Sequence, residues 1–245
     1  MNRIKFTILM TVFIDVLGFG IVLPVLPFYA QSFGLSPFII TMLFAVYSFF
    51  SFFSSPLLGA LSDRIGRRPI LIISILSSAI GWLVFAGARN VAMLFVGRII
   101  DGLAAGNITT AQSYLVDIAK DGKERTTNLG LIGMIFGLGF IFGPFLGGLL
   151  AQVSHVFPFW FVGFLSLVNV ISAYWFLPET NINKSVGKKL DFNPFNPIVR
   201  SLKNRMLRPS YCVWFLFLLA VSLVQSIFSL YLMARFGFEE FTSGL

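Results

Sequence analysis

Seven long apolar stretches alternate with short polar segments along the chain, and each stretch has the length of a membrane-spanning helix. A helix needs about 20 mostly apolar residues to cross the hydrocarbon core of a bilayer. The stretches are Phe6–Ala30, Phe38–Ala60, Ile70–Ala88, Ala92–Val116, Leu129–Ala151, Phe157–Leu177 and Tyr211–Met233. This pattern predicts an all-α polytopic membrane protein, with a six-helix lobe over residues 1–179, a polar loop over 180–209 and a further helix within 210–245.

Composition narrows the class further, because the chain carries far fewer polar groups than a soluble domain needs to cover its surface. Of the 245 residues, 57% are hydrophobic and 11% are charged, and the mean hydropathy is +0.88. One cysteine, Cys212, and one histidine, His155, cannot supply a disulfide or a Cys/His metal cluster. The sequence also lacks a clustered nucleophile and base and a phosphate-binding loop, so we expect neither an enzyme nor a bound cofactor or metal.

Basic residues fall almost entirely on one side of the predicted spans. With spans alternating in direction, 15 of the 18 Lys and Arg residues lie on the side of the N-terminus, and only Arg89 and Arg235 lie opposite. Because cytoplasmic loops carry an excess of Lys and Arg, we expect a cytoplasmic N-terminus and a protein of the plasma (inner) membrane. Topology then explains the net charge of +8, and no nucleic-acid partner is expected.

Three ionisable residues fall inside the predicted spans, where charges are costly and usually functional. At a rise of about 1.5 Å per residue, Asp15 lies about 13 Å from the inner edge, and Arg98 and Asp101 lie about 9 and 13 Å from the outer edge. A carboxylate in a low-dielectric site favours its protonated form, and a nearby arginine opposes this. We expect these residues to couple transport to protons, with Asp15 as carrier and Arg98 as tuning cation. The alternative is a static ion pair between Arg98 and either aspartate that only fixes packing.

Polar side chains recur at helical spacing close to these charges, which lipid-facing helices do not show. Thr109 and Gln112 share a stripe with Arg98, Tyr29 shares one with Asp15, and Gln225 lies on a polar stripe of the last apolar stretch. We expect these four side chains to face a shared interior and to line a substrate pathway.

The stretch Leu129–Ala151 carries a glycine motif that predicts a close helix contact. Its members are Gly139, Gly143, Pro144, Gly147 and Gly148. Small residues four positions apart let helices approach closely, and a proline inside the helix permits a kink. Packing is the direct interpretation of this motif, and a role in gating is the second.

The loop between the second and third stretches has an unusual set of residues at fixed offsets. It contains Gly59, Asp63, Arg64, Gly66, Arg67, Arg68 and Pro69. Gly66 permits a tight turn, and Pro69 suits the first turn of a helix. Asp63 and the arginines can form charge-assisted bonds across helix ends. A basic loop that only sets topology would not require Gly, Asp and Pro at these positions.

This loop resembles the cytoplasmic loop motif of the major facilitator superfamily, Gly-x-Leu-x-Asp-Arg-x-Gly-Arg-Arg-Pro, throughout its length. Gly97–Gly102 resembles the arginine motif of that family, and the glycines around Pro144 resemble its Gly-Pro-Gly-Gly motif of proton-coupled exporters. Asp15–Pro27 is similar to the first helix of the drug:proton antiporters, including tetracycline exporters, and Leu177–Thr180 resembles the usual end of helix six.

The resemblance implies alternating access by two six-helix lobes, with protons moving inward as a small lipophilic compound such as tetracycline moves outward. It implies multidrug efflux and antibiotic resistance as the biological role. Asp63 and Arg67 would latch the outward-open state, and Asp117 would pair with Arg67. Two alternatives stay open: an uptake carrier for a sugar or metabolite, and a non-transporting fragment or interaction subunit.

Length is where the chain departs from this family, because two six-helix lobes need about 400 residues. The 245 residues supply one lobe and the first helix of another, so a missing second lobe is an expected partner. The short repeat between Phe33-Gly34 and Phe236-Gly237 predicts that the last helix begins a second copy. Three explanations compete: a truncated product of a full transporter, a half-transporter that dimerises, and a decayed remnant without transport.

Overall fold

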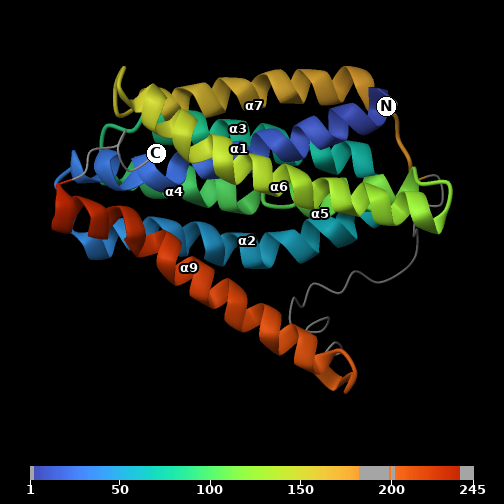
Figure 1. Ribbon diagram of the computed structural model, residues 1–245. Coiled ribbons are helices and arrows are strands. Elements are labelled where there is room, and N and C mark those ends of the chain that lie inside the picture. Colours follow the sequence, from blue (N-terminus) through green and yellow to red (C-terminus); the bar gives the residue numbers. More distant parts are fainter. Residues whose placement is uncertain (1–2, 182–198, 200–201, 238–245) are drawn as a thin grey trace.

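The computed structural model describes residues 3–181, 199 and 202–237, and the described part folds as a bundle of long helices (Figure 1). The helices are α1 (Arg3–Gln31), α2 (Pro37–Ile65), α3 (Arg67–Ala86), α4 (Val91–Leu103), α5 (Asn107–Asp117), α6 (Gly122–Ala151), α7 (Phe157–Phe176) and α9 (Arg208–Phe236). Within these residues, seven segments are long and apolar enough to cross a membrane. The all-α, polytopic fold predicted from the apolar stretches is confirmed.

The fourth predicted span is not one continuous helix, which corrects the expectation for Ala92–Val116. It consists of α4 and α5, separated by a turn over residues 104–106. Gly102, just before the turn, and Gly106, its last residue, let α2 approach closely. A Cβ at Gly102 would lie 2.8 Å from the Tyr47 carbonyl oxygen, and one at Gly106 would lie 2.5 Å from the Leu58 Cβ. Glycine is also a poor helix former, so the helix is interrupted at the place where α2 packs closely against it.

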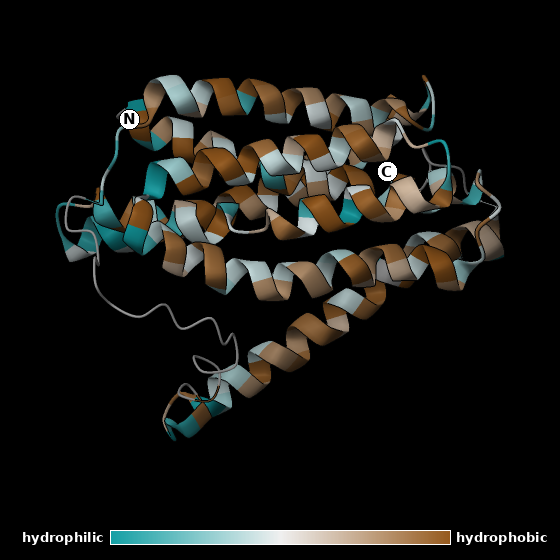
Figure 2. Ribbon diagram, turned by 180° about the vertical axis from the view of Figure 1, so that it is seen from behind, coloured by the Kyte–Doolittle hydropathy of each residue, from teal (hydrophilic) through white to brown (hydrophobic). Residues whose placement is uncertain are grey.

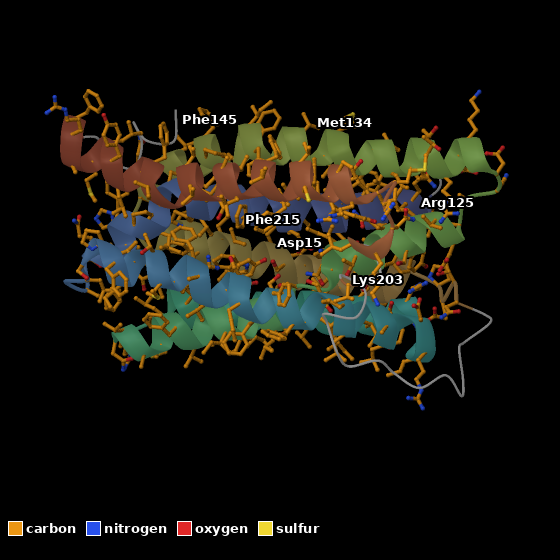
Figure 3. All side chains as sticks on the ribbon, turned by 90° about the horizontal axis from the view of Figure 1, so that it is seen from below. Asp15, Arg125, Met134, Phe145, Lys203 and Phe215 are labelled. Atoms are coloured by element: carbon orange, nitrogen blue, oxygen red, sulfur yellow. The ribbon has the colours of Figure 1, made fainter. Side chains whose placement is uncertain are left out.

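Helix α1 lies at the centre of the bundle and packs against α6, α7 and α5 (Figure 1). Its buried residues join two hydrophobic clusters, one around Phe85 and Phe159 and one around Ile8 and Tyr114. Many large hydrophobic side chains are exposed on the outside of the bundle, and hydrophobic residues run along the length of the helices (Figure 2). Met134 and Phe145 on α6 point away from the bundle (Figure 3). A bundle that is apolar both inside and outside is suited to lipid.

The glycine motif lies at the contact between α6 and α1. A Cβ at Gly143 would lie 2.6 Å from the Gly20 Cα, and a Cβ at Gly147 would lie 2.6 Å from the Ile21 carbonyl oxygen. Gly139 similarly faces Val16, while Pro144 lies inside α6 and Gly148 is buried. The structure thus places the motif at a backbone-to-backbone contact, as its packing interpretation requires.

Helix α9 crosses the bundle obliquely and packs against α1 and α2 (Figure 1). The Ser229 hydroxyl lies 3.3 Å from the Leu23 carbonyl oxygen, to which it donates. Gly34 after α1 and Gly237 after α9 both have left-handed φ angles, 73° and 65°, in agreement with the short repeat. The spacing of Ile198, Val199, Leu202 and Met206 also suggests a short amphipathic helix in the 180–209 loop. Ile198 lies outside the described residues, whereas Val199 and Leu202 are helical, Met206 lies in a turn, and all three side chains are exposed.

Candidate functional site

A cavity of about 380 Å³ lies inside the lobe and is lined by side chains from α1 to α7. Its aromatic lining is Phe19, Tyr47, Trp82, Phe136 and Phe140, and its polar lining is Asp15, Ser51, Ser55, Ser78, Asp101, Asn107, Thr109 and Ser166. This size and mixture are typical of small-molecule sites. No group of three or more metal-ligating side chains occurs among the described residues.

Asp15 reaches this cavity from α1 and lies within the bundle, whereas Arg125 lies toward one end (Figure 3). One carboxylate oxygen of Asp15 is buried and accepts no hydrogen bond from any described residue. The Asn107 side chain interacts with the carboxylate, and the negative charge of Asp101 acts on it through space. Asp15 is therefore an acid group at the wall of an internal cavity, outside the ion pairs of the described structure.

Arg98 is held in an aromatic cage and pairs with Asp101. Its side chain is 1% exposed, and its Nη1 donates to Asp101 Oδ2 at 3.1 Å. The guanidinium carbon lies 4.9 Å from the Trp82 ring centre, 5.1 Å from that of Tyr47 and 5.6 Å from that of Phe85. Cation–π contacts and the ion pair offset part of the cost of burying the charge, since Nε and Nη2 of Arg98 have no hydrogen-bond partner among the described residues. The static pair considered from the sequence is thus present, and Asp15 stands apart from it.

The break between α4 and α5 is satisfied by two hydroxyls from α2. Ser54 Oγ donates to the Gly102 carbonyl oxygen at 2.8 Å, and Ser55 Oγ donates to the Ala105 carbonyl oxygen at 2.7 Å. A broken helix survives at membrane depth when neighbouring side chains bind the freed backbone groups. The break places Asn107, the first residue of α5, at the cavity wall beside Asp15.

Asn107 is a site residue that was not predicted from the sequence. The available signal was an amide side chain within an apolar span, directly after Gly106. Asn107 is 5% exposed, and its interaction with Asp15 crosses from α5 to α1.

Replacing Ser54 with alanine is expected to destabilise the helix break. The Gly102 carbonyl would lose its shortest hydrogen bond and keep the longer one from the Ala105 N–H at 3.3 Å, which lowers the free energy of unfolding by about 1 kcal/mol. The matched control is Ser48→Ala, because Ser48 lies on the same helix and is exposed. Thermal unfolding of both purified variants in detergent checks this. Equal melting temperatures for Ser54→Ala and Ser48→Ala would contradict the role of Ser54.

The predicted loop between α2 and α3 is reduced to Gly66, and its charged residues lie at the ends of the two helices, close to the end of α5. The Arg67 guanidinium pairs with Asp63 and with Asp117, whose Oδ2 lies 3.1 Å from Nε, and Nη1 donates to Ser62 Oγ at 2.7 Å. Arg68 Nη2 donates to the Tyr174 carbonyl oxygen on α7 at 2.7 Å. Four helices thus meet at this loop. Arg64 is exposed, and a Cβ at Gly59 would meet open space within the described structure.

The four side chains expected along a substrate pathway are not all at the cavity. Thr109 lines it, whereas the cavity lining does not include Tyr29, Gln112 or Gln225. The Tyr29 hydroxyl donates to the Phe85 carbonyl oxygen at 3.3 Å, and its ring packs in the core against Phe33 and Phe159. Gln112 on α5 and Gln225 on α9 are half-buried. The structure gives Tyr29 the position of a residue that joins α1 to α3.

Six of the seven candidate spans of the described residues surround a cavity with embedded charges, an arrangement typical of a polytopic membrane transporter. The family model of the Major Facilitator Superfamily matches residues 8–245, and the chain belongs to this superfamily. The family expected from the loop and helix motifs is confirmed.

Several curated proteins are similar to this chain. The class C tetracycline resistance protein of Escherichia coli is 34% identical over 200 residues, which are 80% of this chain and 50% of that protein. The class H protein of Pasteurella multocida is 36% identical over 183 residues, 74% of this chain and 46% of that protein. Quinolone resistance protein NorA of Staphylococcus aureus (strain MRSA252) is 32% identical over 171 residues, which are 70% of this chain and 44% of that protein. The chain spans about half the length of these relatives.

The fold is also similar to that of a solved transporter. The crystal structure of the human organic anion transporter MFSD10 (TETRAN) superposes with a TM-score of 0.77 at 23% identity, covering 99% of this chain and 67% of that one. This comparison shows that the arrangement of helices is that of a transporter of the same fold.

Proposed function

We propose that the chain forms the first lobe of a proton-coupled exporter of drugs or other small lipophilic compounds. The observation that carries the proposal is Asp15, a carboxylate on the wall of a cavity lined by five aromatic rings. The names of the tetracycline and quinolone resistance relatives support a drug as cargo. The N-terminus is proposed to face the cytoplasm, with the protein in the plasma (inner) membrane.

In this proposal Asp15 takes up and releases the transported proton. The Arg98–Asp101 pair lies next to the same cavity and supplies a buried positive charge and a second carboxylate. Movement of α1 relative to α4 changes the distance from Asp15 to these charges and hence its affinity for a proton. The aromatic rings contact the lipophilic cargo, so that the proton and the cargo bind in the same cavity.

The charged loop acts as the latch in the same proposal. Arg67 at the start of α3 holds the ends of α2 and α5 through Asp63 and Asp117, and releasing these pairs would let these helix ends separate. The close contact of α1 and α6 through Gly143 transmits movement of α1 to the outer face of the lobe. These roles follow the alternating-access scheme that the family resemblance implies.

Export is tested with the full-length gene product, the complete translation product of the reading frame that encodes these residues. Expressed in a drug-sensitive cell that lacks its own exporters, it is expected to lower the accumulation of tetracycline or a fluoroquinolone. Unchanged accumulation of every test compound, together with entry of a sugar or metabolite, would instead support the uptake alternative.

A second candidate function stands beside export, since the chain spans about half the length of the relatives it matches and transport belongs to the whole protein. It is a non-transporting fragment or interaction subunit that lacks the second lobe. Vesicles that contain the 245-residue chain alone distinguish the two. Proton-driven dye flux from this chain would exclude the fragment, whereas flux only on co-expression of a second lobe would support it.

A further inference from the structure

The segment Pro178–Asn181, which follows α7, binds the connection between α2 and α3. Glu179 Oε1 accepts hydrogen bonds from the backbone N–H groups of Arg67 at 2.9 Å, Thr180 at 3.1 Å and Asn181 at 2.9 Å. Its Oε2 accepts a bond from the Arg68 backbone N–H at 3.2 Å. The Glu179 carboxylate therefore binds the first two backbone N–H groups of α3 and also the backbone N–H groups of the two residues that follow Glu179.

The first turn of α3 needs such an external partner, because Gly66 precedes it and has no side chain to cap the helix. The N–H groups of a first helical turn have no partner within the helix, and a negative charge there is favoured by the helix dipole. Gly66 has a φ of 134°, and a Cβ at this position would overlap the Glu179 carboxylate. Gly66 thus serves both the turn and the approach of Glu179.

The same segment also binds the end of α2 and reaches α5. Asn181 Nδ2 donates to the Asp63 carbonyl oxygen at 2.7 Å and approaches that of Ser62 at 3.3 Å. The Tyr114 hydroxyl on α5 donates to the Pro178 carbonyl oxygen. The residues directly after α7 therefore hold the ends of α2 and α3 in a fixed relation to α5.

We infer that Glu179 is a positioning residue of the latch. It fixes the backbone of Arg67 at the start of α3, in the position from which the Arg67 guanidinium contacts both Asp63 and Asp117. Through Asn181 and Pro178, the segment that leaves the lobe is tied to the same point. The positioning geometry stands on these contacts, and its consequence for transport rests on the proposed function.

The geometry is tested by hydrogen exchange at the backbone amides of Arg67 and Arg68. Glu179→Ala is expected to speed their exchange roughly tenfold, because both amides lose a charged acceptor. Glu179→Gln keeps one oxygen as acceptor and is expected to give a smaller increase. The matched control is Glu124→Ala, which removes a carboxylate that caps the Lys120 amide at the start of α6. Unchanged exchange at Arg67 and Arg68 in Glu179→Ala would overturn the inference, whether or not the protein transports a drug.

The consequence for transport is tested in the full-length gene product. Glu179→Ala is expected to lower the maximal transport rate about tenfold with an unchanged KM, because the cavity is untouched. If Glu179 acts through Arg67, the double variant Arg67→Ala with Glu179→Ala is expected to be no slower than Arg67→Ala alone. Independent, multiplying effects would overturn the positioning role. Absence of transport in the unmodified protein would instead count against the proposed function and leave the exchange result standing.

Discussion

Replacing Asp15 with asparagine is expected to abolish proton-driven transport while leaving the protein folded. Asparagine has nearly the same shape but cannot carry a proton, so we expect the transport rate under a proton gradient to fall by about 100-fold or more. Its side chain still meets Asn107 at the cavity wall, which preserves the local packing. Transport in everted vesicles, with melting temperature as the check on folding, measures both effects.

The control for Asp15→Asn is Glu124→Gln, which makes the same change from acid to amide at a half-buried position on α6 outside the cavity lining. It is expected to transport at the rate of the unmodified protein. Proton coupling retained by Asp15→Asn would show that Asp15 is not the sole carrier. Asp101 would then be the next acid at the same cavity to replace.

Replacing Gly143 with alanine is expected to have the largest effect on stability. The added Cβ would lie 2.6 Å from the Gly20 Cα and 2.8 Å from the Gly20 carbonyl carbon, so α1 and α6 must move apart. Backbone atoms cannot move aside as a side-chain end can, and we expect a loss of about 3 kcal/mol or more. Thermal unfolding in detergent and the yield of folded protein measure this loss.

Gly137→Ala is the matched control for Gly143→Ala, because a Cβ at Gly137 on the same helix meets no described atom within 4 Å. Alanine favours helix over glycine, so this control is expected to be neutral or slightly stabilising. A melting temperature for Gly143→Ala as high as that of Gly137→Ala would contradict the close contact of α1 and α6.

The apolar stretches predicted the spans well because lipid imposes one simple demand, about 20 apolar residues for each crossing. The same demand hides interruptions, since the stretch from Ala92 to Val116 stays apolar through the break at residues 104–106. What stabilises that break is Ser54 and Ser55, about fifty positions earlier on α2. A contact between distant segments of this kind leaves no periodic trace in the sequence.

The candidate site likewise combines residues that the sequence identifies with contacts that only the packing of distant segments creates. Asp15, Arg98 and Asp101 stood out because charges inside apolar stretches are rare, and the structure brings all three close to one cavity. Sequence spacing could not show that Arg98 pairs with Asp101 rather than Asp15, because that choice depends on how α1 packs against α4 and α5. Glu179 gave no sign of its contact with the α2–α3 loop beyond its place in the Leu177–Thr180 pattern.

The most direct test of the central claim is the movement of drug and protons in one preparation. Liposomes containing the inverted full-length gene product are loaded at acidic pH, and labelled tetracycline and internal pH are followed together. The account predicts that tetracycline accumulates inside only while the interior is acidic, with protons leaving at the same time, and that Asp15→Asn shows neither movement. Accumulation that ignores the pH gradient, or that is the same in Asp15→Asn, would contradict a proton-coupled exporter that works through Asp15.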